Sequence, residues 1–277
     1  MTQHSQISEL EESARLARKY VFDQIYASGS GHPGGSLSCI EILVALYLGR
    51  VKPDSQWIHT TDRDHIILSK GHAVPALYSV LALAGLIPVD ELKTLRQLGS
   101  RLQGHPDRSR LLEIEMSTGS LGQGLSVGLG QAIALQDINS SHFAFVVLGD
   151  GEMNSGQVWE AIAYAGSAGL GKLVAILDAN GIQNDGRVED IQNLMPYREK
   201  LESFGWAVYE VDGQSMEEVL GAIQWATSDE LADKPKVVIA NTTKGAGVSF
   251  MENQVDWHSH ALSDEEYQAA CKEVMSS

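Results

Sequence analysis

The chain has 277 residues, of which 36 are acidic and 20 are basic, and its formal net charge is −16. This acidity argues against nucleic acid or an anionic membrane surface as a partner, because phosphate groups are bound by basic faces. With 43% apolar residues the chain can bury a sizeable core, so a largely disordered protein is excluded as well.

Cysteine content and the first residues indicate where the protein works. Its two cysteines, Cys39 and Cys271, are too few for a disulfide scaffold or a structural zinc ribbon. No apolar run approaches the roughly 18 residues that suggest a membrane span. The first five residues, Met1 to Ser5, lack the basic and apolar regions of a signal peptide. We therefore expect a soluble, cytoplasmic protein.

Apolar residues recur either at helical spacing or in short strand-like runs. In chain order we predict a helix over 7–27, a strand over 65–68, helices over 73–85, 89–98 and 123–136, a strand over 143–148, a helix over 157–168, a strand over 173–177, a helix over 192–204, and strands over 207–211 and 237–240. The Ser-x-x-Glu pattern of a capping box, which marks helix starts, occurs at Ser8/Glu11, Ser38/Glu41, Ser215/Glu218 and Ser263/Glu266.

The predicted strands are apolar at nearly every position rather than at every second one. Such strands are typical of a parallel sheet that is covered by helices on both faces. Because strand and helix patterns also alternate, we predict an α/β fold, doubly wound around a mostly parallel sheet. No internal repeat, low-complexity tract or Pro/Gly-rich linker divides the chain, so we expect residues 1–277 to form a single domain.

Two predicted strands end in residues that could hold a metal ion. The strand over 143–148 runs into Gly149-Asp150-Gly151, and the strand over 173–177 is soon followed by Asn180. Ligands in open α/β sheets bind beyond the carboxyl ends of the strands. One carboxylate and one amide oxygen, with glycines that allow close approach, suit Mg²⁺ held together with a diphosphate. The alternative is a pair of ordinary turns, since Asp and Gly are common in turns.

Further motifs add to this pair. Gly149-Asp150-Gly151 followed by Asn180 resembles the motif of thiamine diphosphate enzymes. The other motifs occur in the order and spacing found in transketolases: Gly31-His32-Pro33-Gly34-Gly35-Ser36, Asp64-His65-Ile66-Ile67-Leu68-Ser69-Lys70-Gly71-His72-Ala73, Gly104-His105-Pro106, Thr118-Gly119-Ser120-Leu121-Gly122-Gln123-Gly124, and Trp257-His258 after Thr243-Lys244-Gly245-Ala246-Gly247-Val248. The chain therefore resembles the transketolase family over roughly residues 10–265.

The resemblance covers only part of the usual enzyme. A one-chain transketolase is more than twice as long, and this chain resembles its N-terminal domain, which binds the diphosphate of the cofactor. The middle domain, which binds the aminopyrimidine ring of the cofactor, has no counterpart in these 277 residues. The resemblance thus implies the N-terminal subunit of a split transketolase, which works with a separate C-terminal subunit in an α2β2 assembly.

The resemblance also assigns site residues. The metal, expected to be Mg²⁺ with Ca²⁺ or Mn²⁺ as alternatives, would be held by Asp150, Asn180 and the backbone carbonyl of Ile182. The residues that match contacts to thiamine diphosphate are His72, Gly119, Ser120, Leu121, Asp150, Gly151, Asn180 and Ile182. Proton transfer and oxyanion stabilisation on the sugar are assigned jointly to His32, His105 and His258, because the sequence does not apportion the steps.

Other candidate residues receive structural interpretations. His65 lies in a predicted strand and is interpreted as structural, and the histidines outside the motifs are interpreted as surface or core residues. Lys244 is interpreted as a solvated loop lysine, with an anion contact as the alternative. Ser155 stands where family members often carry a glutamate of a network that links two active sites, whereas Glu160 matches the second acid of that network. Coupling between the sites is therefore in question.

Three hypotheses about function stay open at this point. The first is two-carbon ketol transfer from a ketose to an aldose. The second is a subunit of another thiamine diphosphate enzyme, similar to deoxyxylulose-phosphate synthase or to a 2-oxo acid dehydrogenase. The third is a non-catalytic transketolase-like subunit. The motifs over 31–33 and 69–72 favour the first. The sugars, pentose phosphates or specialised and sulfonated sugars, are not determined by the sequence.

Overall fold

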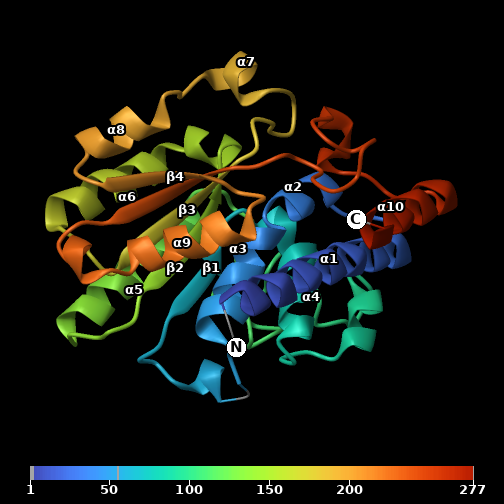
Figure 1. Ribbon diagram of the computed structural model, residues 1–277, viewed down its shortest axis with the longest axis horizontal. Coiled ribbons are helices and arrows are strands. Elements are labelled where there is room, and N and C mark those ends of the chain that lie inside the picture. Colours follow the sequence, from blue (N-terminus) through green and yellow to red (C-terminus); the bar gives the residue numbers. More distant parts are fainter. Residues whose placement is uncertain (1–2, 55, 277) are drawn as a thin grey trace.

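A five-stranded sheet, entirely parallel, forms the centre of the computed structural model, which describes residues 3–54 and 56–276 (Figure 1). Its strands are β1 (His65–Leu68), β2 (Ala144–Gly149), β3 (Leu173–Ala179), β4 (Ala207–Asp212) and β5 (Lys236–Asn241). The strand order is β1-β2-β3-β5-β4, and every neighbouring pair is parallel. All five predicted strands and the parallel α/β fold are thereby confirmed.

The burial of the strands explains why their sequences are so uniformly apolar. Every residue of β2 is buried, as are all but the last residues of β3 and β5. The exception is β4, an edge strand that exposes Tyr209, Glu210 and Asp212. A strand with helices on both faces has no solvent side, so it shows no alternation of polar and apolar residues.

Two hydrophobic clusters cover the two faces of the sheet. Alternate residues of each inner strand belong to opposite clusters; in β2, for example, Phe145 and Val147 face one cluster and Val146 and Leu148 the other. The first cluster includes residues of α1 (Gln3–Ser28), α2 (Pro33–Ser38), α3 (Ile40–Val44), α4 (Val74–Leu83), α9 (Met216–Ala226) and α10 (Asp264–Ser276). The second includes α5 (Gln123–Asp137), α6 (Gly156–Ala168) and α8 (Tyr197–Ser203). This arrangement is the doubly wound architecture predicted from the sequence.

Short helical segments complete the described fold. The helix α7 (Val188–Gln192) lies in the long connection between β3 and α8 (Figure 1). A π-helical turn covers Ala45–Val51, and short 3₁₀ helices cover Trp57–His59, Gly71–Ala73, Val89–Thr94, Gly151–Asn154, Asp229–Leu231 and Val255–His258. Several of these turns carry residues of the predicted site.

One of the four predicted capping boxes is confirmed in full and one in part. Ser215 accepts a hydrogen bond from the backbone N–H of Glu218 at the start of α9, but the Glu218 carboxylate accepts from the N–H of Asp212 instead of returning the bond to Ser215. At the start of α10, Ser263 and Glu266 bond each other's backbone N–H groups. The prediction at Ser8 is wrong, because α1 already includes Gln3 and Ser8 lies inside it. The prediction at Ser38 is also wrong, because its hydroxyl bonds the distant carboxylate of Asp178 instead of capping a helix.

Two predicted helices differ from the structure, each because of local backbone geometry. The helix predicted over 89–98 is only a 3₁₀ helix that ends at Thr94, and Arg96 adopts a left-handed φ of 60°. The helix predicted over 192–204 begins at Tyr197, after Pro196, which has extended backbone at the N-cap. Proline has no N–H to donate and favours a helix start over a helix interior.

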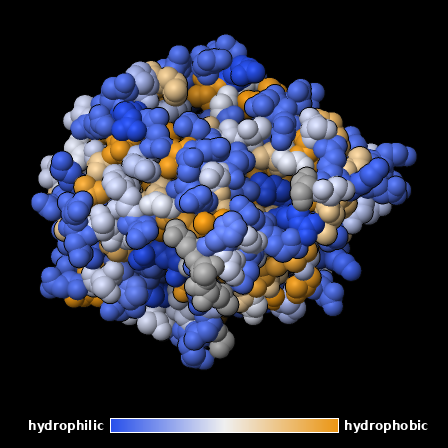
Figure 2. All heavy atoms as spheres, in the orientation of Figure 1, coloured by the Kyte–Doolittle hydropathy of each residue, from blue (hydrophilic) through white to orange (hydrophobic). Residues whose placement is uncertain are grey.

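The surface and the cysteines agree with the expectations from composition. On the face shown in Figure 2, hydrophilic residues predominate and hydrophobic ones lie in small groups. Among the described residues, no helix is both long and apolar enough to cross a membrane. Cys39 is buried and Cys271 is partly buried, and both are free thiols. The expected lack of a signal peptide concerns in part Met1 and Thr2, which lie outside the described residues.

Candidate active site

Four neighbouring strands end at one edge of the sheet, and each continues into a polar segment. β1 leads into Ser69–His72, and β2 leads into Gly149–Glu152. β3 ends in Asp178-Ala179 and leads into Asn180–Ile182, while β5 leads into Thr242–Lys244. Gly149 pairs in register with Asp178, so the ends of β2 and β3 lie side by side. The predicted metal residues are thereby brought together at the carboxyl edge.

A cavity of about 190 Å³ lies at this edge. It is lined by the predicted residues His72, Leu121, Asp150, Gly151, Asn180, Ile182 and His258, together with Gly35, Lys70, Gly149, Glu152, Gln183, Asn184, Asp185 and Lys244. A larger cavity of about 520 Å³ shares Asp150 with it and is lined mainly by residues of the 181–199 segment. Histidines line the 190 Å³ cavity but not the 520 Å³ cavity, so we take the 190 Å³ cavity as the candidate site.

The three predicted metal-binding residues form one end of this cavity. The Asp150 carboxylate accepts hydrogen bonds from the backbone N–H groups of Gly151 (2.8 Å) and Gly181 (2.5 Å). The amide oxygen of Asn180 accepts from the N–H of Ile182 at 3.1 Å. A Cβ atom added at Gly151 would lie 2.7 Å from that of Gln183, so glycine is needed for the two loops to approach.

This donor set fits an oxygen-preferring divalent cation. Burial and the nearby Asp178 carboxylate raise the pKa of Asp150 to about 6, so its charged form is disfavoured without a counterion. Within residues 3–54 and 56–276, no cluster of three or more His, Cys, Asp or Glu side chains could bind a metal alone. Mg²⁺ suits one carboxylate, one amide oxygen and one carbonyl, because it takes its other ligands from phosphate and water.

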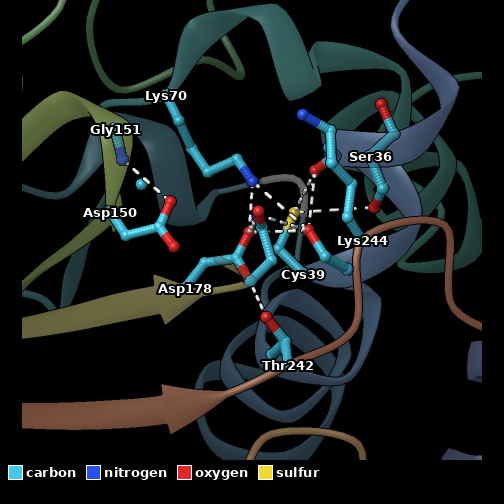
Figure 3. Close-up of polar contacts among 12 residues, drawn as sticks. Ser36, Cys39, Lys70, Asp150, Gly151, Asp178, Thr242 and Lys244 are labelled. Carbon is cyan, nitrogen blue, oxygen red and sulfur yellow. Dashed lines mark hydrogen bonds and ion pairs between the residues drawn. The ribbon is translucent and has the colours of Figure 1, made fainter. Parts of the chain in front are cut away.

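A buried ion pair lies beside Asp150, one of the predicted metal-binding residues (Figure 3). Lys70 and Asp178 are 1% and 0% exposed, and the ammonium group contacts the carboxylate directly. Asp178 also accepts hydrogen bonds from Thr242, from Ser38 at 2.6 Å and from Asn180 at 3.2 Å. Burial alone would lower the pKa of Lys70, but the attraction of Asp178 outweighs it and raises the pKa. Asp178 thus holds the side-chain amide of Asn180 in place through this hydrogen bond.

A second buried carboxylate, Glu152, joins three loops of the cavity. It accepts hydrogen bonds from the Ser69 hydroxyl (2.5 Å) and from the N–H groups of Gly122 (2.6 Å) and Gly149 (3.2 Å). Burial raises the pKa of Glu152, and these hydrogen bonds partly offset that effect. Neither Glu152 nor Asp178 was predicted as a site residue from the sequence. Asp178 could have been suspected, since it ends a strand at the edge where Asn180 lies.

Four histidines from distant segments lie together at the other end of the cavity; His72 and His258 line it, whereas His32 and His105 do not. The ring centroid of His32 lies 5.5 Å from that of His72, 6.2 Å from His105 and 5.6 Å from His258. The rings of His72 and His258 are stacked, 5.1 Å apart. We call these four residues the histidine cluster. All four belong to the sequence motifs and were predicted as site residues.

The histidine cluster is uncharged near neutral pH. Burial, together with the cations Arg96 and Lys244 and the neighbouring His105, lowers the pKa of His32 to about 4. Burial and Lys244 lower the pKa of His258 to about 3. Burial also lowers the pKa values of His72 and His105. Neutral imidazoles can both donate and accept protons, which suits work on hydroxyl and carbonyl oxygens.

The interpretation of Lys244 as a solvated lysine is wrong. Its side chain is buried, with 1% of its surface exposed. Its ammonium group donates to the carbonyl of Ile182 at 3.0 Å and lies 2.8 Å from Nδ1 of His258. Burial lowers its pKa to about 8. Lys244 therefore connects the metal-binding end with the histidine cluster, and its alternative interpretation as an anion contact fits this position.

The glycine loop is placed only partly as predicted. Leu121 lines the cavity, and Gly119, with φ of 140°, packs against the ring of His105. Ser120 is exposed and does not line the cavity. His65 bonds Glu115 and the carbonyl of Thr61, outside the cavity, in agreement with its structural interpretation.

The residues of the expected coupling network lie on or next to α6. Ser155 is the N-cap residue of this helix, and Glu160 is exposed one turn further along. Neither residue lines the cavity. Their position leaves the predicted metal-binding residues unaffected by the change at Ser155.

Comparisons with known proteins agree with the arrangement of the site. Residues 10–275 match the family model described as "Transketolase, thiamine diphosphate binding domain". The chain is 40% identical over 266 residues to a 6-deoxy-6-sulfo-D-fructose transketolase subunit of Clostridium sp. (strain MSTE9), and the match covers 96% of each. It is 39% identical over 271 residues to an apulose-4-phosphate transketolase subunit of Phocaeicola vulgatus, covering 97% of this chain and 95% of the relative.

Among solved structures, a transketolase from Leishmania mexicana is similar, with a TM-score of 0.89 and 30% identity. The match covers 96% of this chain but 41% of that one. The chain thus matches two relatives of similar length almost end to end, and about two fifths of a one-chain structure.

Proposed function

The chain belongs to the transketolase family, whose thiamine diphosphate-binding domain it comprises, and on this premise we propose that it is the N-terminal subunit of a two-component transketolase. Transketolases are transferases, and the coverage of the relatives supports a split enzyme. The two relatives named above are called subunits and match over nearly their whole length, whereas a one-chain transketolase is covered to 41%. The described residues form one sheet, which supports a single cofactor-binding domain.

One observation carries the proposal. A single cavity brings together an oxygen donor set for a divalent cation and two rings of the histidine cluster, His72 and His258. A bound diphosphate needs the cation that the oxygen donors would hold, and a reacting sugar needs the histidine rings for proton transfer. A non-catalytic subunit would have no reason to keep both, so this geometry favours ketol transfer over a purely binding role.

We assign the metal-binding end to Mg²⁺ and the cofactor diphosphate. Asp150, Asn180 and the carbonyl of Ile182 would hold the ion, with Gly151 leaving room for the diphosphate. Since Lys244 now donates to the Ile182 carbonyl, the ammonium would turn towards the phosphate oxygens when the ion takes that carbonyl. Thiamine diphosphate, when bound, supplies the carbon centre that carries the two-carbon unit.

We assign the histidine cluster to the sugar and to the reactive side of the cofactor. His72 would contact the cofactor, as would Gly119 and Leu121, whereas the exposure of Ser120 supports at most a backbone contact. His32, His105 and His258 would bind the sugar oxygens and exchange protons with them. Their lowered pKa values keep them neutral, so that each ring offers one donor and one acceptor.

The partner, substrates and location complete the proposal. A transketolase C-terminal subunit would supply the contacts to the aminopyrimidine ring, in an α2β2 assembly. The donor would be a ketose and the acceptor an aldose, each carrying a phosphate or a sulfonate at the far end, since the two relatives are named for such sugars. The cytoplasm is the proposed location, which the two free cysteines support.

Reconstitution tests this proposal. The chain and a transketolase C-terminal subunit are purified separately and mixed with thiamine diphosphate and Mg²⁺. Ketol transfer is then measured with xylulose 5-phosphate, 6-deoxy-6-sulfofructose and apulose 4-phosphate as donors. We expect transfer from one of these donors, only in the mixture. Turnover of pyruvate in preference to every ketose would overturn the reaction class, and full activity of the chain alone would overturn the need for a partner.

A further inference from the structure

Arg96 has an unusual backbone for an arginine. Its φ of 60° lies in the left-handed region, which costs free energy for any residue with a Cβ atom. The turn is held by a hydrogen bond from the Arg96 N–H to the carbonyl of Leu102, at 2.8 Å. Strained conformations of this kind persist where the surrounding structure requires them, and they are common at functional sites.

The turn directs the Arg96 guanidinium into the histidine cluster. The side chain is half-buried, and one of its nitrogens donates to the hydroxyl of Ser30. Another lies 3.3 Å from Nδ1 of His32. A Cβ atom added at Gly104 would lie 2.7 Å from Nε of Arg96, so the chain next to His105 leaves space for this guanidinium.

The partners of Arg96 are unusual for a charged group in a protein interior. Among the residues that the structure describes, Arg96 forms no ion pair with a carboxylate. Its neighbours are a hydroxyl and an imidazole, which do not neutralise it. Burying a charged group without a counterion costs free energy, so a contribution to stability does not explain the position of Arg96.

The contact with His32 has only one consistent assignment of protons. A guanidinium has five N–H donors and no acceptor, and it stays charged in proteins. The nitrogen that faces it, Nδ1 of His32, must therefore accept the hydrogen bond and carry no proton. In a neutral imidazole the single proton then resides on Nε2.

We propose that Arg96 is a positioning residue that holds neutral His32 in the Nε2–H form, so that His32 acts as a hydrogen-bond donor to a substrate oxygen. The proposal rests on the proposed function, since it takes the histidine cluster as the sugar-binding end of the site. It separates the roles of two of the three histidines that the sequence left joint. His32 donates, whereas His105, whose ring nitrogens have no hydrogen-bond partner among the described residues, is free to take up and release a proton.

The other groups around His32 agree with this assignment. The rings of His72, His105 and His258 surround it, and Lys244 and Arg96 are the cations that act on it. No carboxylate is among the described contacts of His32, so nothing there would hold a proton on Nδ1. Burial and the two cations keep the ring neutral over the working pH range, which leaves the tautomer as the property that Arg96 controls.

The tautomer can be measured directly in the full chain, without any assay of activity. Histidines are labelled with ¹⁵N, and long-range ¹H–¹⁵N spectra report which ring nitrogen of His32 carries the proton. Two variants remove the donor: Arg96→Gln, and Arg96→Gly, whose backbone is compatible with a left-handed φ. Arg101→Gln is the matched control, because Arg101 lies on the same segment but pairs with Glu91 and not with a histidine.

We expect wild-type His32 and the Arg101→Gln variant to show the Nε2–H form alone, and both Arg96 variants to show a mixture with the Nδ1–H form. In the assembled enzyme, kcat should fall about 10- to 100-fold in the Arg96 variants. Cofactor affinity should change less than about threefold, because Arg96 does not line the metal-binding end.

Two results would overturn the inference: an Nδ1–H form of His32 in the wild type, or an unchanged tautomer in both folded Arg96 variants. Equal losses of kcat in Arg96→Gln and Arg101→Gln would also contradict it. If the mixture with the partner shows no ketol transfer at all, the proposed function fails, while the spectra still decide the role of Arg96.

Discussion

The two ends of the candidate site are built in opposite ways. At the metal-binding end, Asp150 and Asn180 follow directly from neighbouring strands, and buried carboxylates such as Asp178 brace them. At the other end, the four rings of the histidine cluster come from segments far apart in the chain, and burial and nearby cations keep His32 and His258 neutral. The proposed metal-binding end thus combines buried carboxylates with backbone donors, whereas the other end gathers imidazole rings that are kept neutral.

The largest expected effect is a loss of stability when the buried Lys70–Asp178 ion pair is broken. Replacing Asp178 by Asn would leave the Lys70 ammonium buried without its partner. We expect the free energy of unfolding in urea to fall by about 3–5 kcal/mol. Glu202→Gln, which removes an exposed ion pair with Arg198, should cost less than about 1 kcal/mol. Similar losses in both variants would mean that the ion pair does not brace this end.

A smaller but more specific effect is expected at the metal itself. Asp150→Ala removes the carboxylate of the proposed metal site, so the affinity for thiamine diphosphate in the presence of Mg²⁺ should fall about 100-fold or more. Calorimetric titration of the assembled enzyme would measure it. The exposed Asp190 on α7 provides the control, and Asp190→Asn should bind as the wild type does. Unchanged affinity in Asp150→Ala would contradict the metal assignment.

Lys244 contacts both ends, so its replacement would test whether they act together. In Lys244→Met we expect cofactor affinity to fall about tenfold, because an ammonium next to the phosphates is lost. The pKa of His258 should rise at the same time, since Lys244 is one cause of its low value. Calorimetry would measure the affinity and NMR titration the pKa. The control is Lys172→Met, because Lys172 directly precedes β3, at the end of the strand opposite the site. A change at only one end would show that the ends are independent.

The dependence of stability on pH should differ in sign between the two ends. The folded-state pKa values of His32 and His258, about 4 and 3, lie below the ordinary 6.5. Their contribution is therefore complete above pH 6.5 and is lost as the pH falls towards 4 and 3. For Asp150 the folded value of about 6 lies above the ordinary 3.8, so its contribution is present at low pH and is lost as the pH rises through 6.

Unfolding experiments between pH 4 and 7 would test the contribution of the histidines. Replacing His32 or His258 by Asn should reduce the loss of stability on acidification, by on the order of 1 kcal/mol for each ring. The exposed His59→Asn variant should follow the wild-type curve. Identical pH profiles for all three variants would mean that the histidine cluster is not held neutral by its surroundings.

The same contrast determines how much could be predicted from the sequence. The five strands were predictable because buried parallel strands are uniformly apolar, and the placement of Asp150 and Asn180 followed from the strand ends. The histidine cluster could be selected only by resemblance to a family, since no local pattern brings residues 32, 105 and 258 together. Lys244 was misjudged because its burial depends on α2 and the 181–183 loop, which no nearby residues reveal.

Arg96 illustrates the limit most clearly. Its neighbours favour a helix over 89–98, and nothing in that pattern indicates a left-handed turn after Thr94. The turn is held by Leu102, and the side chain is placed by Ser30 and His32, more than sixty residues earlier in the chain. Contacts of such long range override local helix propensity, and at this position they direct a guanidinium into the site.

The central claim is that this chain carries the metal-binding end and the histidine cluster of an active site, and that a second subunit completes this site. A transketolase C-terminal subunit is titrated into a fixed concentration of this chain, with thiamine diphosphate and Mg²⁺, while ketol transfer is followed. The account predicts no transfer without the partner, a linear rise, and a plateau at one partner per chain that Asp150→Ala abolishes. Transfer by this chain alone at the plateau rate, or a plateau that Asp150→Ala leaves unchanged, would contradict it.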